Sequence, residues 1–494
     1  MWLGASALSW ASTPETTRTI SIFHTTDLHG NIVPTKNYQN VPNLGGIARC
    51  ATCIEQWRQE NPHSLLIDCG DVYQGTVVST ASKGNLFMQL FNHMKYDAWV
   101  LGNHDLDWGP EATEKNLSLS DSDILTANLT VDGVPSGQLQ GAWSKVKPWA
   151  MKDVGGFKIA LIGLITPGLP YWLADAILGK ASATDPLESL KKSLSEAKAA
   201  GADAILLLGH MGFRKEDDFA NRVFECLRET QGIDAYIGGH THQDQPSWDC
   251  HGVLCSQANY FGIHCGRIDL TFDLTTRKIV ARHAATMLMD ERFELHPEIM
   301  KMTESARNEA DASLASVVGQ VREPIAGSGR NSPLAQLFCR LFLESLAEEG
   351  IAADAAFHGT FDSGDLKVGP VTMADCWKMM PFDNFLTVFS VTPAQLIEII
   401  QEDFAGGRSD RSLWPLTLEL DTEGNPAKVL KDGKPLAGDA RIRLAMNSYD
   451  AQSGGKRLMK LRDLVRSPQA ERVTNQTSTL DALAAGFRRH ESLP

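Results

Sequence analysis

The sequence predicts an α/β sandwich followed by a smaller α+β domain. From about residue 18 to 285, apolar strand-like runs alternate with amphipathic helices, which is typical of α/β folds. Two of these runs, 158–165 and 204–208, are apolar throughout, as expected for strands buried on both faces. At 494 residues the chain is also too long for one ordinary hydrophobic core, so at least two domains are expected.

The first domain is expected at residues 18–290. Its predicted strands are Ile20–His24, Ser64–Cys69, Ala98–Leu101, Lys158–Ile165, Ala204–Leu208 and Ala235–Ile237. Helices are predicted between them, at Gly46–Gln59 and Pro186–Ala200, because apolar residues recur there at helical spacing. Cys50 and Cys53 lie on the first of these helices, so we expect buried helix residues rather than a redox pair.

A charged segment at residues 291–312 predicts a helix that links the two domains. The second domain is expected at residues 313–494. Two helices are predicted in it, at Pro333–Glu349 and Thr392–Phe404, and a β-rich stretch follows from Trp414 to Asn447. This change from alternating strands and helices marks a separate fold unit.

Composition and charge argue against several classes of partner. The chain is 43% hydrophobic and 21% charged, as is usual for a globular protein. Its formal net charge of −14 disfavours binding to a nucleic-acid polymer or an anionic membrane. The sequence contains no run of 18 apolar residues, so no membrane span is expected. A small phosphate ester remains compatible, because bound metal makes a site locally positive.

Residues 1–17 are open to two interpretations. The apolar, small-residue stretch at 1–12 is typical of the end of a signal peptide, with Ser9-Trp10-Ala11 as a cleavage zone. This predicts a periplasmic or extracellular protein, whereas the alternative is a disordered N-terminal arm. Cys250 and Cys255 flank a turn-like His-Gly and are candidates for a disulfide in an oxidising compartment.

Five short motifs carry the chemistry, and each follows closely on a predicted strand. In chain order they are Asp27-Leu-His29, Gly70-Asp71, Gly102-Asn103-His104-Asp105, Gly209-His210 and Gly239-His240-Thr-His242. Loops at the carboxyl ends of strands meet at one edge of an open α/β sheet, so the five motifs are expected at a single site. Taken alone, each motif is commonly a loop or turn. The occurrence of all five after strands of one domain indicates a shared function.

The residue types in these motifs suit two borderline divalent cations such as zinc, manganese or iron. One carboxylate has to bridge if two metals share the set, and Asp71 is the expected bridge. The first site is then completed by Asp27, His29 and His242, and the second by Asn103, His210 and His240.

Such a pair of metals predicts phosphoester hydrolysis. Two divalent cations against two carboxylates leave about two positive charges, enough to hold a phosphate dianion. Metals about 3.5–4 Å apart lower the pKa of a shared water from about 15.7 toward 7, and the resulting hydroxide is expected to attack phosphorus. His104 is expected to donate a proton to the leaving oxygen, with Asp107 or Asp105 fixing its tautomer.

In this order the motifs resemble those of the calcineurin-like metallophosphoesterases. Residues 24–31 and 44–49 narrow the resemblance to the branch of 5′-nucleotidases and 2′,3′-cyclic-nucleotide phosphodiesterases. The resemblance implies a four-layer αββα first domain, a C-terminal substrate domain and a small phosphate ester as substrate, most often a nucleotide. It also implies that Asp107 rather than Asp105 orients His104.

In the second domain the resemblance implies a set of substrate contacts. Residues 380–384 look like a Pro-Phe-x-Asn segment of the family, and residues 447–455 look like its nucleotide loop. The implied contacts are Arg330, Asn447, Tyr449 and Trp414, the two aromatic residues being candidates for the walls around a base. Where nucleotidases carry an Asn and an Arg, this chain has Phe357 and Asp362. The difference from the family is therefore expected in the nucleobase pocket.

The favoured function is therefore a 5′-nucleotidase-type phosphomonoesterase with two divalent metals. The altered run from Phe357 to Asp362 motivates an alternative, namely a phosphodiesterase or a hydrolase of another phosphate or sulfur ester. A non-catalytic binding protein on the same scaffold is disfavoured, because no ligand and no general acid is missing from the motifs.

Overall fold

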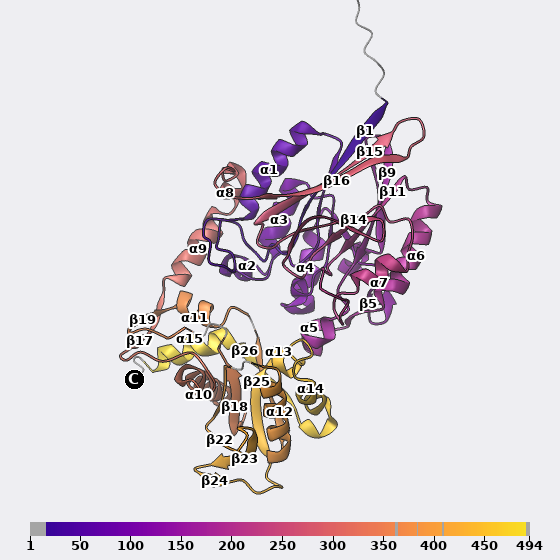
Figure 1. Cartoon of the computed structure of the whole chain (residues 1–494). Helices are drawn as coiled ribbons and strands as arrows, with labels where there is room; N and C mark the ends of the chain where they lie inside the picture. The colour runs from indigo at the N-terminus through magenta and orange to yellow at the C-terminus, as the bar shows by residue number, and fades with distance from the viewer. Residues whose placement is uncertain (1–15, 361–363, 383, 408–409, 491–494) are drawn as a thin grey trace, which may run out of the picture.

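The computed structural model describes residues 16–360, 364–382, 384–407 and 410–490. The expected signal peptide or arm at residues 1–12 lies outside these described residues. Two β-sheets form the centre of the first domain (Figure 1). The seven-stranded sheet has the order β16 (Ile279–Leu288), β15 (His264–Asp273), β1 (Thr17–Thr25), β2 (Ser64–Asp68), β3 (Ala98–Val100), β4 (Asp123–Leu125) and β7 (Val146–Lys147). The six-stranded sheet has the order β13 (Asp244–Cys250), β14 (Val253–Ala258), β12 (Ala235–Gly238), β11 (Ala204–Gly209), β9 (Phe157–Leu164) and β8 (Trp149–Val154).

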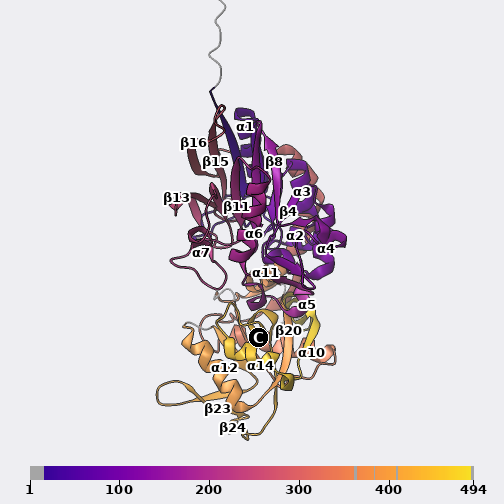
Figure 2. The same cartoon turned by 90° about the vertical axis from the view of Figure 1, so that its right-hand side faces the viewer.

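The two sheets pack face to face because alternate side chains of each strand point to opposite faces. Ile20 and Ile22 of β1 join Leu206 and Leu208 of β11 in the core between the sheets. The outer face of the first sheet is covered by α1 (Ile47–Glu60), α3 (Asn85–Met94) and α4 (Gly109–Leu119). The outer face of the second is covered by α6 (Pro186–Ala199) and α7 (Val223–Arg228). In Figure 2, α3 and α4 lie to the right of the strands and α6 lies in front of them. The packing of these helices on the two sheets confirms the predicted four-layer αββα sandwich.

The six predicted strands are confirmed, and each ends within about one residue of its expected carboxyl end. Cys50 and Cys53 are buried on α1, as expected. The expected pairing of Cys250 with Cys255 is wrong, since both are free thiols. The antiparallel register explains this result, because it sets Cys250 opposite Val253 and Cys255 opposite Trp248.

The linking segment contains two short helices, not one long one. They are α8 (Pro297–Met302) and α9 (Glu304–Leu314), separated at Thr303. The first helix cannot start at residue 291, because Pro297 lacks the N–H that a helix interior requires and instead occupies its first turn. The second helix, α9, leads from the first domain to the second (Figure 1).

The second domain is built on a five-stranded sheet in the order β21 (Arg411–Trp414), β18 (Ala355–Gly359), β25 (Ile442–Asn447), β20 (Phe385–Val391) and β26 (Val473–Ser478). One core cluster joins it to α10 (Pro333–Glu348) and α15 (Thr479–Arg489), and another to α12 (Pro393–Ala405) and α14 (Met459–Arg466). Both α10 and α12 begin at a proline, which suits the first turn because no N–H is needed there. The hydroxyls of the preceding Ser332 and Thr392 cap that turn. Smaller elements are β17 (Val317–Val321) paired with β19 (Gly369–Thr372), α11 (Met373–Met379) and α13 (Ser448–Ala451), and a three-stranded sheet of β22 (Thr417–Leu420), β23 (Pro426–Lys431) and β24 (Lys434–Pro435).

A short segment around η3 (Leu169–Tyr171) joins the two domains at a second place. The carbonyl of Tyr171 accepts hydrogen bonds from Gly455 N at 3.1 Å and Ser453 Oγ at 3.3 Å. Its ring centroid lies 4.5 Å from Lys456 Nζ and 4.4 Å from the Arg462 guanidinium carbon. These contacts bring the loop after α13 next to the η3 segment of the first domain. Within the described part of the chain, no helix has the length and apolarity to cross a bilayer.

Candidate metal centre and the adjoining cavity

Seven side chains of the first domain converge from the carboxyl ends of five strands. Those after β1, β2 and β3 come from one sheet, and those after β11 and β12 come from the other. Six of the seven form two groups whose ligand atoms all lie within 4.8 Å of one another: Asp27, His29 and His242 in one group, and Asp71, His210 and His240 in the other. The grouping matches the division predicted from the sequence.

Asp71 lies between the two groups. Its Oδ2 is 3.1 Å from His210 Nε2 and 3.8 Å from His29 Nε2. On one side, His29 Nε2 is 3.0 Å from His242 Nε2, which is 3.4 Å from Asp27 Oδ1. On the other side, Asn103, the seventh residue, places its Oδ1 at 3.2 Å from His210 Nε2. The bridging position expected for Asp71 is therefore compatible with this geometry.

Two of the histidines are held in the tautomer that metal binding requires. His29 Nδ1 donates to the carbonyl of Gln74 at 2.8 Å, and His210 Nδ1 donates to the carbonyl of Cys69 at 2.7 Å. A carbonyl oxygen only accepts, so Nδ1 carries a hydrogen in both rings, and the lone pair of Nε2 faces the centre once that nitrogen is deprotonated. Burial lowers the pKa of His29 to about 4 and that of His240 to about 3, which keeps both rings neutral near pH 7.

The two carboxylates are ionised despite their burial. Burial alone would raise the pKa of Asp71, but His210 and His104 hold it well below its usual range. Burial likewise acts against ionisation of Asp27, yet the contact with His242 lowers its pKa. Two carboxylates, four imidazoles and one amide oxygen in this arrangement fit a pair of borderline divalent cations.

The backbone of the ligand loops is unusual. Positive φ angles occur at five of the seven converging residues: Asp27 (50°), His29 (46°), Asp71 (55°), His240 (72°) and His242 (54°). Left-handed backbone is uncommon outside glycine, and it costs roughly 1–2 kcal/mol per residue. Strain of this kind concentrates at functional sites, where the surrounding structure enforces it.

His104 and its two neighbouring carboxylates have separate roles. Asp107 Oδ2 lies 2.7 Å from His104 Nδ1, which leaves Nε2 free to face a substrate. Burial alone would lower the pKa of His104, but Asp107 and Asp71 raise it to about 10. Asp105 instead accepts backbone N–H groups, from Asp71 at 3.0 Å, from Val72 at 2.8 Å and from Gly102 at 2.8 Å. Asp105 therefore shapes the ligand loops and does not contact the His104 ring nitrogens.

A cavity of about 460 Å³ runs from this centre into the second domain. Asn103, His104 and His240 form its inner end. Its remaining walls come from both domains: Asp107, Trp172, Leu173, Ala174, Ile177 and Arg214 from the first, and Phe382, Asn384, Phe385, Ser448, Tyr449 and Arg457 from the second. The volume is in the range of small-molecule sites in proteins.

The four expected substrate contacts lie in different places. Tyr449 lines the cavity. Asn447 is buried beneath the cavity wall, where its Oδ1 caps α13 and its Nδ2 contacts His358 Nε2 at 3.0 Å. Arg330 stacks on the Phe404 ring at 3.4 Å. Trp414 lines a different hollow, whose other walls include Pro324, Pro333 and Arg340. The structure thus places Tyr449 at the cavity and the other three expected contacts away from it.

Several cavity residues were not among the contacts named from the sequence, although Phe382 lies in the segment 380–384 that resembles the family's Pro-Phe-x-Asn. Trp172 lies with its ring centroid 5.1 Å from that of His240, and Phe382 stacks parallel to His104 at 6.1 Å. Arg214 and Arg457 follow four residues after His210 and two residues after Gly455, and that closeness to the motifs was the signal available. Phe357, one of the two altered positions, is buried in the core. The other, Asp362, lies outside the described residues.

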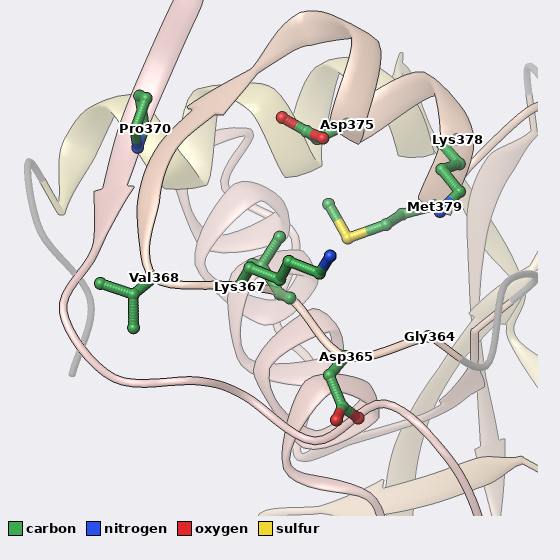
Figure 3. Close-up of a pocket in the computed structure, with 9 residues that line it drawn as sticks. Gly364, Asp365, Lys367, Val368, Pro370, Asp375, Lys378 and Met379 are labelled. Atoms are coloured by element: carbon green, nitrogen blue, oxygen red, sulfur yellow. The ribbon is translucent and has the colours of Figure 1, made fainter.

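A smaller hollow of about 260 Å³ lies in the second domain next to α11 (Figure 3). Its walls include Lys367, Asp375, Lys378 and Met379, and it shares no residue with the cavity at the metal centre. The Asp375 carboxylate is already engaged, because it accepts from Thr372 N at 2.8 Å and so completes the capping box of α11.

Comparison with known proteins relates both domains to described families. Residues 20–244 match the calcineurin-like phosphoesterase family, which uses divalent metals, and residues 316–462 match the C-terminal domain of 5′-nucleotidases. Over 254 residues the chain is 30% identical to the trifunctional nucleotide phosphoesterase protein YfkN of Bacillus subtilis, covering 47% of this chain and 17% of that one. It is 27% identical to the snake venom 5′-nucleotidase of Naja atra, covering 60% of this chain and 59% of the relative.

Solved structures share the fold of this chain. A putative 5′-nucleotidase from Staphylococcus aureus superposes with a TM-score of 0.78 at 20% identity, covering 94% of this chain and 96% of that one. At this identity the likeness concerns the fold. The matched region spans about a sixth of the length of the Bacillus subtilis relative and about three fifths of the length of the Naja atra relative.

Proposed function

We propose that this chain, which joins a calcineurin-like phosphoesterase domain to a 5′-nucleotidase C-terminal domain, is a 5′-nucleotidase-type phosphomonoesterase that works with two divalent cations. One observation carries the proposal: the convergent ligands and the cavity are continuous. The cavity is lined by His104 and His240 of the metal centre together with Phe382 and Tyr449 of the second domain.

In this proposal, Asp27, His29 and His242 hold one cation, and Asn103, His210 and His240 hold the other, with Asp71 shared. The cations would supply Lewis acidity toward a phosphoryl oxygen and lower the pKa of water at the centre. Without them, Asp71 raises the pKa of His210 to about 9 even though burial lowers it, so loading the second site has to displace a proton from His210.

The chain's own residues would supply the proton and the orientation. With its pKa raised to about 10, His104 is an imidazolium at neutral pH, and its Nδ1 is engaged by Asp107. Its Nε2–H is then the donor for the leaving oxygen of the ester. Arg214 and Arg457 add positive charge to the same cavity, which favours an anionic substrate.

The cavity walls support a nucleoside as the leaving group. Phe382 and Tyr449, both aromatic, come from different segments of the second domain and line the same space. Aromatic faces suit a nucleobase, because base–aromatic stacking contributes about 1–3 kcal/mol per base. This assignment replaces Trp414 with Phe382 as the second aromatic wall.

The test is phosphate release by the purified chain loaded with Mn²⁺ or Zn²⁺. AMP and UMP should be hydrolysed, and an Asp71→Asn variant should lose that activity, because the shared carboxylate is gone. Turnover of aryl phosphates without turnover of any nucleotide would contradict the nucleotide assignment. Hydrolysis of 2′,3′-cyclic nucleotides in preference to monophosphates would favour the phosphodiesterase alternative.

We also infer export to the periplasm or the extracellular space. The inference is supported by the apolar, small-residue N-terminal stretch and by similarity to a snake venom enzyme. Fractionation of producing cells tests it, and recovery of the chain in the cytosolic fraction alone would contradict it.

A further inference from the structure

One exposed tyrosine contacts His242, which is more accessible than the metal-site histidines His29 and His210. The His242 side chain is 23% exposed, compared with 7% for His29 and 0% for His210. Tyr38 lies over it, with Oη 2.6 Å from His242 Nδ1. The Tyr38 residue itself is 59% exposed, so burial of apolar surface does not explain its position.

This contact differs from those of the neighbouring ligands. The Nδ1 atoms of His29 and His210 are held by backbone carbonyls, whereas the described partner of His242 Nδ1 is the Tyr38 hydroxyl. Its oxygen accepts from Nδ1–H when the Nε2 lone pair of His242 points toward Asp27 and His29.

The loop that carries Tyr38 is pre-organised. Its ends are paired by hydrogen bonds between Thr35 and Leu44 in both directions, at 2.8 and 2.9 Å. Within it, Asn37 Oδ1 accepts from the backbone N–H groups of Gln39 at 3.0 Å and Val41 at 2.9 Å.

Tyr260 also holds Tyr38 in place. The backbone N–H of Tyr38 donates to Tyr260 Oη at 2.9 Å, and the two rings stack with centroids 4.2 Å apart and planes 19° from parallel. Buried Arg49 holds the far end of the loop by donating to the Asn43 carbonyl at 2.6 Å. An exposed side chain held by this many contacts has little rotamer freedom left to lose on contacting His242.

We propose that Tyr38 is a positioning residue that holds His242 in its metal-binding orientation and thereby sets the affinity of the Asp27–His29–His242 site for its divalent cation. The inference rests on the proposed two-metal centre and concerns one of its two cations. Tyr38 acts through His242 and not on the substrate, since it does not line the cavity.

The test uses the full chain stripped of metal with a chelator and titrated with Co²⁺, followed by its d–d absorption and by calorimetry. Tyr38→Phe keeps the ring on Tyr260 and removes only the hydroxyl. It should weaken one of the two Co²⁺ equivalents by roughly 10- to 100-fold, as loss of an outer-shell partner typically does, and leave the other unchanged. Excess metal should restore phosphate release to within about twofold of the parent chain, because the transfer machinery is intact.

The matched control is Val41→Ala, on the same loop and 48% exposed, without a contact to any proposed ligand. It should bind both equivalents with parental affinity. Parental affinity for both equivalents in Tyr38→Phe would overturn the inference, and so would an equal loss in Val41→Ala, which would assign the effect to loop packing. A parent chain that binds two Co²⁺ but releases no phosphate from any ester defeats the proposed function alone, because the titration still decides the role of Tyr38.

Discussion

At the scale of single residues, strain and charge are concentrated in the candidate metal centre. Five left-handed, non-glycine residues at roughly 1–2 kcal/mol each represent several kcal/mol that the fold sustains at this one place. Asp27 and Asp71 also remain ionised while buried. A bound cation interacts favourably with the same carboxylates that are costly to bury without one. The stability of this chain is therefore expected to depend on its metals.

The two carboxylates next to His104, Asp105 and Asp107, should separate into a structural and a catalytic effect. Asp107→Asn is expected to lower kcat by roughly 10²- to 10⁴-fold, because His104 loses the carboxylate that orients it and keeps it protonated. The melting temperature should change little, because the Asp107 carboxylate contacts the His104 ring and does not accept the backbone N–H groups that Asp105 holds. Phosphate-release kinetics and calorimetry on the same samples measure both quantities.

Asp105→Ala is the matched variant and should behave in the opposite way. It leaves the buried N–H groups of Asp71, Val72 and Gly102 without their acceptor, at a cost of about 1–3 kcal/mol for each unsatisfied group. We expect a large fall in melting temperature together with loss of metal. An Asp105→Ala chain of parental stability would contradict the structural role given to this carboxylate.

His24 should make the stability of the chain sensitive to acid. It is fully buried on β1, and neither ring nitrogen has a partner among the described residues. Burial lowers its pKa to about 3, compared with about 6.5 in the unfolded chain. Between these values only the unfolded chain binds the proton, so the free energy of unfolding falls by about 1.4 kcal/mol for each unit of pH below about 6.

Urea unfolding between pH 4.5 and 8 measures this dependence. His24→Phe keeps a ring of similar size beside Gly266 and removes the titration, so the slope below pH 6 should decrease by the equivalent of one proton. The exposed His251→Gln is the control and should keep the parental slope. Identical slopes in the parent and His24→Phe chains would show that His24 is not the group responsible.

At the scale of elements, the ligand loops are positioned by close backbone approach at the strand ends. A Cβ at Gly102, directly after β3, would overlap the Asp71 carboxylate and its backbone N. Glycine at position 102, directly before Asn103 and His104, is therefore required for a steric reason, because one ligand loop passes close against another there.

Gly102→Ala is expected to displace Asp71 and to lower the content of both metals, since that carboxylate is shared. Gly438→Ala is the matched control, because a Cβ there meets open space and its φ is not in the left-handed region. Elemental analysis after dialysis against Mn²⁺ compares the two. Full metal occupancy in Gly102→Ala would mean that the loops yield without moving the ligand.

At the scale of the whole molecule, the cavity exists only because two domains meet. The Tyr171 ring lies between Lys456 and Arg462 of the second domain, and its carbonyl binds the Gly455 backbone. These contacts hold the Tyr449 wall of the cavity near the inner end at His104. Nucleotide binding should depend on this junction more than proton transfer does.

Tyr171→Ala should therefore raise the KM for AMP several-fold with a smaller change in kcat, because two cation–π contacts of about 0.5–1 kcal/mol or more each are lost. Tyr171→Phe keeps the aromatic face and should retain the parental KM. Steady-state kinetics separates the two parameters. A KM unchanged in Tyr171→Ala would show that this contact does not hold the cavity in its working shape.

The sequence by itself determined the layered fold of the first domain and the gathering of six of its seven candidate ligands into two groups. Both depend on local features, namely the alternation of apolar runs and the placement of each polar motif directly after a strand. The covalent chain carries such motifs to the strand ends whatever the details of packing. The sequence did not fix the linking helix as well, because the segment predicted as one helix from residue 291 begins at Pro297 and is broken at Thr303.

Only the tertiary structure decided which residues surround the substrate space. Trp414 pairs with Ala356 through the β21–β18 ladder, and this register carries its ring to another hollow. Phe382, Arg457 and Tyr38 reach the centre or its cavity through contacts between segments far apart in the chain. Such contacts depend on strand register, on domain packing and on loop conformation, and none of these is encoded in the spacing of neighbouring residues.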